Sequence, residues 1–172
     1  MKKYLIILSV IIGLFACAEK SPVVKNTIEL PLSNSNKIVV KLMFHNGSIA
    51  DPAGKEGLTY MTANLVAQGG TQDRSYNDIQ DALYPMAAGY YASVDKEVTI
   101  FTFSFHQDFS EQFYPILRDV ILKPAFDESD FNRIKLNQQN YVDQVIRASS
   151  DEEYSKKALE DLLFRGTNYQ HM

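Results

Sequence analysis

One stretch of the chain, "GLTYMTANLVAQGG" (residues 57–70), has the spacing of a catalytic helix. The pattern predicts a helix that begins near Gly57 and ends at the Gly-Gly pair. Tyr60, Ala63 and Asn64 are spaced i, i+3 and i+4, so they lie side by side on one helix face. Two metal ligands at i and i+4 with an acid between them can bind zinc and activate a water molecule. This stretch has the spacing without the side chains for that chemistry.

The other residues with catalytic potential are scattered along the chain. The histidines show no i, i+4 pairing and no acid at ligand spacing, which argues against a zinc site elsewhere; they are His45, His106 and His171. The serines in or near strand-like runs have no His/Asp companion for a hydrolytic triad; they are Ser48, Ser93 and Ser104. The acidic trio after Ser150 is expected to cap a helix rather than to hold a metal.

The N-terminal residues have the pattern of a targeting segment. Two lysines precede an apolar run from Tyr4 to Ala16, which is short for a membrane-spanning helix and typical of a signal peptide. It ends in "LFAC", which resembles a bacterial lipobox, and Cys17 is the only cysteine of the chain. We therefore expect a signal peptide over residues 1–16, lipid attachment at Cys17, a tether over residues 17–26 and a folded domain over residues 27–172. Such a protein would be anchored to the membrane in the bacterial cell envelope.

Composition limits the classes of partner. The 172 residues are 45% hydrophobic and 22% charged, with a net charge of −4, as expected for one globular domain. No basic surplus points to a nucleic-acid partner.

The pattern along residues 27–172 predicts an α+β fold. Two strand-like runs flank a Ser/Asn turn, the second over Lys37 to Phe44, and a hairpin turns at residues 94–97. The quoted helix has an apolar stripe of Leu58, Met61, Leu65 and Val66. Further helices are expected after Ser75, before Pro124, over residues 128–148 and over residues 151–164, the last opened by a capping box of Ser150 and Glu153. The order ββααββααα suggests an antiparallel or mixed sheet covered by helices on one face.

Four phrases, in order, resemble the N-terminal domain of insulinase/pitrilysin-type metallopeptidases. They are "GKEGLTYMTANLVAQGGT", "YASVDKEVTIF", "FYPILRDVILKPAFDESDFNRIK" and "ALEDLLFRGTNY". The resemblance implies a metallopeptidase N-terminal half, similar to LuxS and the mitochondrial processing peptidase. It also implies that this domain is C-terminally incomplete.

By this resemblance, the zinc motif H-x-x-E-H of active relatives is replaced. Its histidines fall at Tyr60 and Asn64 and its Glu base at Ala63, while the third ligand falls near Asn140 or Tyr141. A substrate-facing Asn of active relatives falls at Tyr91. Zinc is the cofactor of active relatives, and these side chains predict none in this chain.

The resemblance leaves two functions open. The first is a non-catalytic lipoprotein that lends a peptide-binding wall or scaffold, with Tyr60, Asn64 and Tyr91 as contacts, to an active zinc-peptidase subunit or to a missing C-terminal half. The alternative is a fragment of an active zinc metallopeptidase that degrades peptides in the cell envelope.

Overall fold

The structure is a computed structural model that describes residues 26–170. The chain divides into two compact units, Met1–Ser33 and Asn34–Met172. The signal segment, Cys17 and His171 lie outside the described residues. In the first unit, residues 26–33 are exposed and form no strand, so the strand predicted before the Ser/Asn turn is wrong. Pro31 interrupts that run and has no N–H to donate to a sheet.

The second unit contains a sheet of three antiparallel strands in its described residues. These are β1 (Lys37–Phe44), β2 (Gly89–Val94) and β3 (Thr99–His106), in the order β1-β3-β2. Strands β2 and β3 form the predicted hairpin, closed by Asp95 N–H donating to the Val98 carbonyl at 2.9 Å. The sheet is therefore antiparallel, and the α+β class is confirmed.

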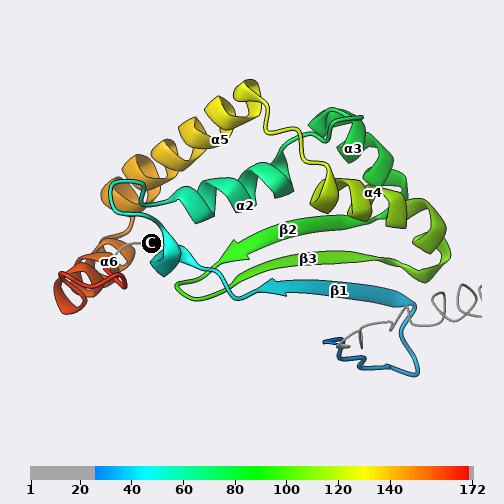
Figure 1. The fold of residues 1–172 in the computed structure, drawn as a ribbon, viewed down its shortest axis with the longest axis horizontal. Helices are drawn as coiled ribbons and strands as arrows, with labels where there is room; N and C mark the ends of the chain where they lie inside the picture. Colours follow the sequence, from blue (N-terminus) through cyan, green and yellow to red (C-terminus); the bar gives the residue numbers. More distant parts are fainter. Residues whose placement is uncertain (1–25, 171–172) are drawn as a thin grey trace, which may run out of the picture. The chain divides into compact units, whose positions relative to one another are not determined.

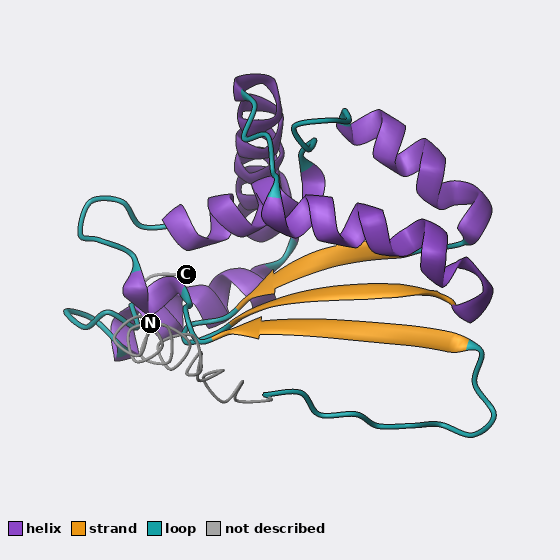
Figure 2. Cartoon of the chain, turned by 45° about the vertical axis from the view of Figure 1, so that its right-hand side comes forward, coloured by secondary structure: helices purple, strands orange, loops and turns teal. Residues whose placement is uncertain are grey.

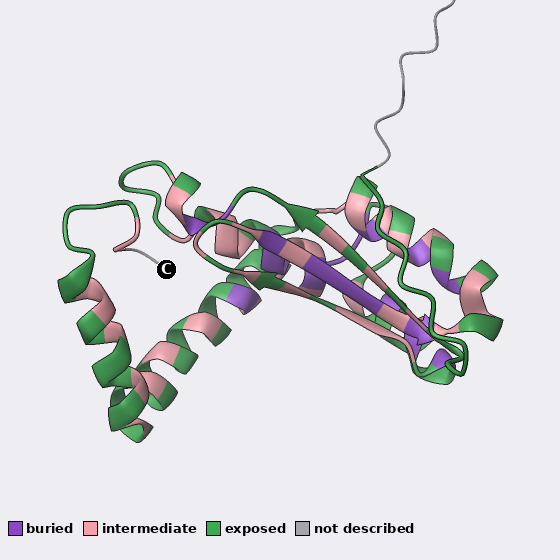
Figure 3. Ribbon diagram, turned by 90° about the horizontal axis from the view of Figure 1, so that it is seen from below, coloured by how far each residue is buried: buried purple, intermediate pink, exposed green. Residues whose placement is uncertain are grey.

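The alternating phenylalanines of β3 form the centre of the core, as predicted. Phe101, Phe103 and Phe105 are all buried, and Phe103 is fully so. Phe105 stacks on Phe113 of a covering helix with ring centroids 4.3 Å apart. Figure 3 shows the buried positions running along β3 between the more exposed β1 and β2.

Helices α2, α3 and α4 cover one face of this sheet (Figures 1 and 2). The helices are α2 (Leu58–Gln68), α3 (Tyr76–Leu83), α4 (Ser110–Leu122), α5 (Glu128–Asn140) and α6 (Asp151–Leu163). Short 3-10 turns occupy Ser48–Ala50, Tyr84–Met86 and Gln107–Phe109. None of the helices within residues 26–170 is long and apolar enough to cross a membrane.

Helix α2 begins where the sequence predicts, and its start has a specific cause. Gly57 has φ of 91°, a left-handed conformation that disfavours any side chain. The Asp51 carboxylate, from the preceding loop, accepts from the N–H groups of Gly57 at 2.7 Å and Thr59 at 2.9 Å. A carboxylate at this end also offsets the positive helix dipole.

The apolar stripe predicted for α2 is only partly correct. Leu58 is 47% exposed, whereas the helix side that meets the sheet carries Ala63 and Ala67 in the core. Small side chains let the backbone of α2 approach strand β2, on which this helix packs. Hydrophobicity alone therefore misplaced the buried face.

Capping agrees with the sequence at two helix starts. Ser75 and Asp78 form a complete capping box at α3. At α6, the Ser150 hydroxyl accepts from the Glu153 N–H at 3.2 Å, while the Glu153 carboxylate pairs with Lys156 at 3.1 Å. The first half of the predicted box at α6 is thus present.

The helix predicted over residues 128–148 changes type partway. It is α-helical through α5 and then continues as a π-helix over Tyr141–Arg147. In a π-helix each hydrogen bond closes a wider turn, and such segments often mark functional positions.

Candidate functional site

The candidate site lies where α2 and α5 pack against each other. The Tyr60 hydroxyl of α2 donates a hydrogen bond to Oε1 of Gln138 on α5 at 2.8 Å. Both side chains are half-buried. This bond joins two helices through residues that are 78 positions apart in sequence.

The Asn64 side chain is turned into its own helix. It is only 6% exposed. Its Nδ2 donates to the Tyr60 carbonyl at 2.9 Å, and its Oδ1 accepts from Gln68 Nε2 at 2.7 Å. Both polar ends of this amide therefore have partners, which is the condition for burying it without a large cost.

The surroundings of the Tyr60 phenol, chiefly its burial, favour the neutral form. Burial raises the pKa of Tyr60 above its ordinary value, the Asn64 side chain opposes that change, and the neighbouring Tyr141 phenol raises the pKa further. A phenol held in its protonated form donates hydrogen bonds and is a poor ligand for zinc.

A second polar contact fixes the other end of the helix pair. Asp130 of α5 accepts from the Gly70 N–H at 2.9 Å and from Arg133 at 2.7 Å. Arg133 also donates to the Gln68 carbonyl and lies 4.9 Å over the Tyr76 ring. These contacts satisfy backbone groups at the C-terminal end of α2, so α5 is fixed to α2 at both ends.

The other residues predicted on α2 and α5 are placed as follows. Ala63 is 3% exposed and packs in the core. Tyr141 is 48% exposed and opens the π-helix close to Tyr60. The structure therefore brings Tyr60, Asn64 and Tyr141 to one place.

Tyr91 lies on the opposite side of the sheet. Its neighbour Tyr90 stacks on Phe103 on the face covered by helices, so Tyr91 points to the other face. It is 59% exposed on β2, a strand at the sheet edge. Tyr91 therefore does not share a face with Tyr60 and Asn64.

The donor set at the α2–α5 junction does not fit zinc. It consists of a neutral phenol, amides and an alanine, and the Tyr60 hydroxyl and the Asn64 amide are already hydrogen bonded. Within residues 26–170, no group of three His, Cys, Asp or Glu side chains could hold a metal ion. His45 is exposed after β1, and His106 Nδ1 accepts from the Asp108 N–H at 3.3 Å.

Gln138 is the site residue that the sequence did not reveal. It stands in the polar run "NQQNYVDQ", where every residue could have faced solvent. The spacing of Gln138 and Tyr141, one turn apart, was the available signal, but it does not identify which side chain reaches α2.

The fold and the site together define a two-layer α+β domain whose helices α2 and α5 are joined by the neutral Tyr60–Gln138 contact at one end and by Asp130 and Arg133 at the other. The sequence model of Insulinase (Peptidase family M16) matches residues 30–171. The chain therefore belongs to the insulinase family of peptidases. No curated protein matches the chain.

Proposed function

We propose that this chain is a non-catalytic member of the insulinase family. It lends a peptide-binding wall to a zinc-peptidase partner subunit or to a second half of the same protein. A lipid on Cys17 would hold it in the bacterial cell envelope, and its fold would be that of the LuxS and mitochondrial processing peptidase group.

The Tyr60–Gln138 hydrogen bond is the observation that carries this proposal. By the family resemblance, Tyr60 stands at a metal-ligand position of α2. Its hydroxyl instead donates a hydrogen bond to Gln138 of α5 at 2.8 Å. Ala63, at the position of the base, has no group that can move a proton. A neutral contact between two side chains thus holds the helix pair that a metal holds in active relatives.

Binding of a peptide is supported by the edge of the sheet. Among residues 26–170, strand β2 is hydrogen bonded to β3 on one side only, so its other side offers backbone N–H and C=O groups to an extended peptide. Tyr91, exposed on this strand, supplies an amphipathic contact surface. Tyr60 lies on the helix-covered face and would contact a peptide separately from Tyr91, and the buried Asn64 would support Tyr60 from within α2.

Zinc binding separates this proposal from an active peptidase. Isothermal titration with zinc should give no stoichiometric binding to the purified chain, since the donor set is neutral and occupied. Zinc bound at one equivalent and lost in the Tyr60→Phe variant would overturn the non-catalytic assignment. The Tyr60→His, Ala63→Glu, Asn64→His variant shows whether the assay detects ligands at these positions.

Peptide binding is tested separately. A fluorescein-labelled unfolded peptide should bind the wild-type chain and lose about tenfold in affinity with Tyr91→Ala, the loss of one aromatic contact. Tyr114→Ala is the matched control, because Tyr114 is 62% exposed on α4 against 59% for Tyr91. Equal losses in both variants, or no binding by the wild type, would refute the peptide-wall role.

A further inference from the structure

The turn between β2 and β3 is hydrogen bonded to the loop before α2. The Ser48 N–H donates to the Asp95 carbonyl at 3.0 Å. The next N–H, that of Ile49, donates to the Lys96 carbonyl, also at 3.0 Å. Gly47 allows this close approach, because a Cβ at this position would clash with the Lys96 carbonyl. The loop and the turn are therefore held together through their backbones.

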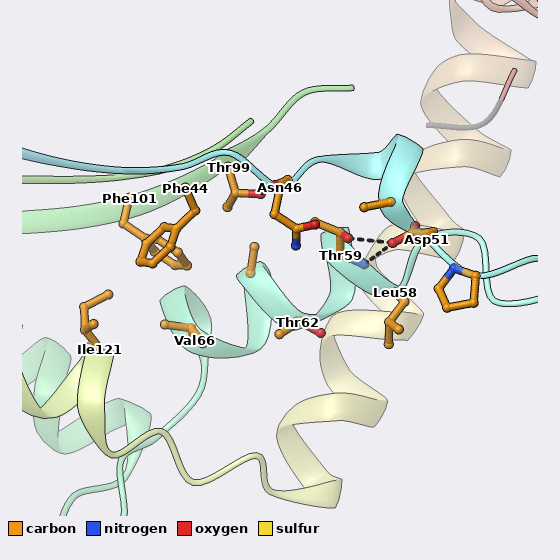
Figure 4. A pocket seen from close by; sticks show the side chains of 13 residues that line it. Phe44, Asn46, Asp51, Leu58, Thr59, Thr62, Val66, Thr99, Phe101 and Ile121 are labelled. Carbon is orange, nitrogen blue, oxygen red and sulfur yellow. Dashed lines mark hydrogen bonds between the residues drawn. The ribbon is translucent and has the colours of Figure 1, made fainter. Parts of the chain in front are cut away.

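The same loop fixes the start of α2. Figure 4 shows the Asp51 carboxylate beside Thr59, whose N–H donates to it at 2.9 Å and whose hydroxyl donates to it at 2.5 Å. Hydrogen bonds to an ionised carboxylate are stronger than those between neutral groups. Because Asp51 follows Ile49 closely in the chain, the position of the loop decides whether this carboxylate reaches the first turn of α2. Tyr60 lies in that turn.

Residues 164–170, which we call the strap, follow α6 and fold back on its last turn. Gly166 has φ of 79°, a left-handed conformation that lets the chain reverse direction. The Gln170 side chain accepts from the Gly166 N–H at 2.9 Å and donates to the Asp161 carboxylate of α6 at 2.7 Å. The Thr167 hydroxyl donates to the Phe164 carbonyl at 2.7 Å. The strap is thus a compact turn with hydrogen bonds of its own.

Lys96 of the β2–β3 turn binds the strap with its side chain. Its Nζ donates to the Tyr169 carbonyl at 2.7 Å and lies 5.4 Å from the centroid of the Phe164 ring. A cation over an aromatic ring is attracted by the electrons of the ring face. The neighbouring Glu97 carboxylate accepts a hydrogen bond from the Tyr169 hydroxyl. Two consecutive residues of the turn therefore hold the strap.

The strap also contacts the loop directly. Asn168 Nδ2 donates to the Ile49 carbonyl at 3.3 Å. Ile49 is thus bonded to the turn through its N–H and to the strap through its carbonyl. Lys96 is bonded to the loop through its carbonyl and to the strap through its side chain. Loop, turn and strap are linked pairwise, so the loss of one link should weaken the other two.

We propose that the strap controls the order of the loop before α2 and, through Asp51, the order of the first turn of α2. Lys96 is the positioning residue of this coupling, because it is bonded to both the loop and the strap. A strap bound to the turn holds the loop in place, and a released strap allows the loop and the start of α2 to open locally. The coupling depends on contacts within residues 46–59, 95–97 and 161–170, so it does not rest on the proposed function.

Amide hydrogen exchange of the full chain, followed by mass spectrometry, tests the coupling. Lys96→Met removes the ammonium group and keeps a side chain of similar length. Exchange should become about fivefold faster in the strap, in residues 48–51 and in the first turn of α2, as expected when a hydrogen bond that opposes local opening is lost. Lys55→Met, the same change at an exposed lysine of the loop, should alter these rates by less than about twofold.

Two further variants perturb the strap and α2 in turn. Tyr169→Phe removes only the hydroxyl that binds Glu97 and should speed exchange in the same three segments. Tyr154→Phe, at a tyrosine of α6 that is 53% exposed, is the matched control and should not. Because coupling between two sites is reciprocal, Thr59→Val, which removes the hydroxyl that donates to Asp51, should speed exchange in the strap as well.

Exchange in β3 is the internal reference, because its central amides open only when the whole domain unfolds. The proposal requires faster exchange in the strap, the loop and the start of α2 without an equal change in β3. Unchanged exchange in Lys96→Met, faster exchange confined to the altered segment, or an equal rise in β3 would each overturn the proposal.

Discussion

The Tyr60–Gln138 hydrogen bond makes a quantitative prediction about how α5 is held to α2. The bond is 2.8 Å long and joins neutral, half-buried groups, a situation in which a hydrogen bond contributes about 1 kcal/mol to stability. Tyr60→Phe removes the donor, and Gln138→Met removes the acceptor with little change of length. Each single variant should lose about 1 kcal/mol of unfolding free energy, or about 3 °C in Tm.

A double-mutant cycle isolates the bond from the rest of each side chain. Because the double variant loses the same bond only once, its cost should fall short of the sum of the single costs by about 0.5–1.5 kcal/mol. Urea unfolding followed by circular dichroism measures all four free energies. Tyr114→Phe, at an exposed tyrosine, should change stability by less than about 0.5 kcal/mol. Additive single costs, within about 0.3 kcal/mol, would refute the reasoning and leave the Asp130 and Arg133 contacts and apolar packing to hold the helix pair.

Two further predictions concern the sheet and its turns. A Cβ on Gly47 would lie 2.3 Å from the Lys96 carbonyl oxygen, so Gly47→Ala should lower the free energy of unfolding by about 2–3 kcal/mol. Gly89→Ala is the control, because a Cβ there meets nothing within 4 Å. Urea unfolding measures both variants. The Tyr90 hydroxyl is buried without a hydrogen-bond partner, so Tyr90→Phe should match or exceed wild-type stability at pH 7. Burial, and then the Tyr76 phenol, raise the pKa of Tyr90 above its ordinary 10.0. The unfolded chain therefore ionises this phenol first. The free energy of unfolding is unaffected below about pH 10 and falls above it by about 1.4 kcal/mol per pH unit. Unfolding at pH 8 and pH 11 should show a smaller alkaline loss in the variant, and equal losses would contradict this account.

Sequence reasoning was most successful where one local rule decided the outcome. The period-2 phenylalanines of β3, the hairpin before them and the Ser75 cap each depend on neighbours within a few residues, and all three are confirmed. The same holds for the start of α2, which requires a glycine at position 57.

Sequence reasoning was less successful where tertiary contacts decide. The buried face of α2 follows from its close packing on strand β2, which favours alanines over the leucine at position 58. Tyr60, Asn64 and Tyr91 were expected to line one chamber, yet Tyr91 lies on the other face of the sheet and Tyr141 is the tyrosine near Tyr60. Gln138 could not be chosen among its polar neighbours, because only the packing of α5 on α2 gives it a partner.

The π-helix at Tyr141–Arg147 affects where a side chain introduced at its first residue would point. Its hydrogen bonds close over five residues, so side chains beyond Asn140 advance around the axis more slowly than in an α-helix. A glutamate introduced at Tyr141 would stand on this widened turn, where counting from active relatives no longer gives its direction. The substitutions at Tyr60, Ala63 and Asn64 lie on the regular helix α2 and are not affected by this change of geometry. The direction of a side chain at position 141 therefore depends on the π-helical hydrogen bonding as well as on its place in the sequence.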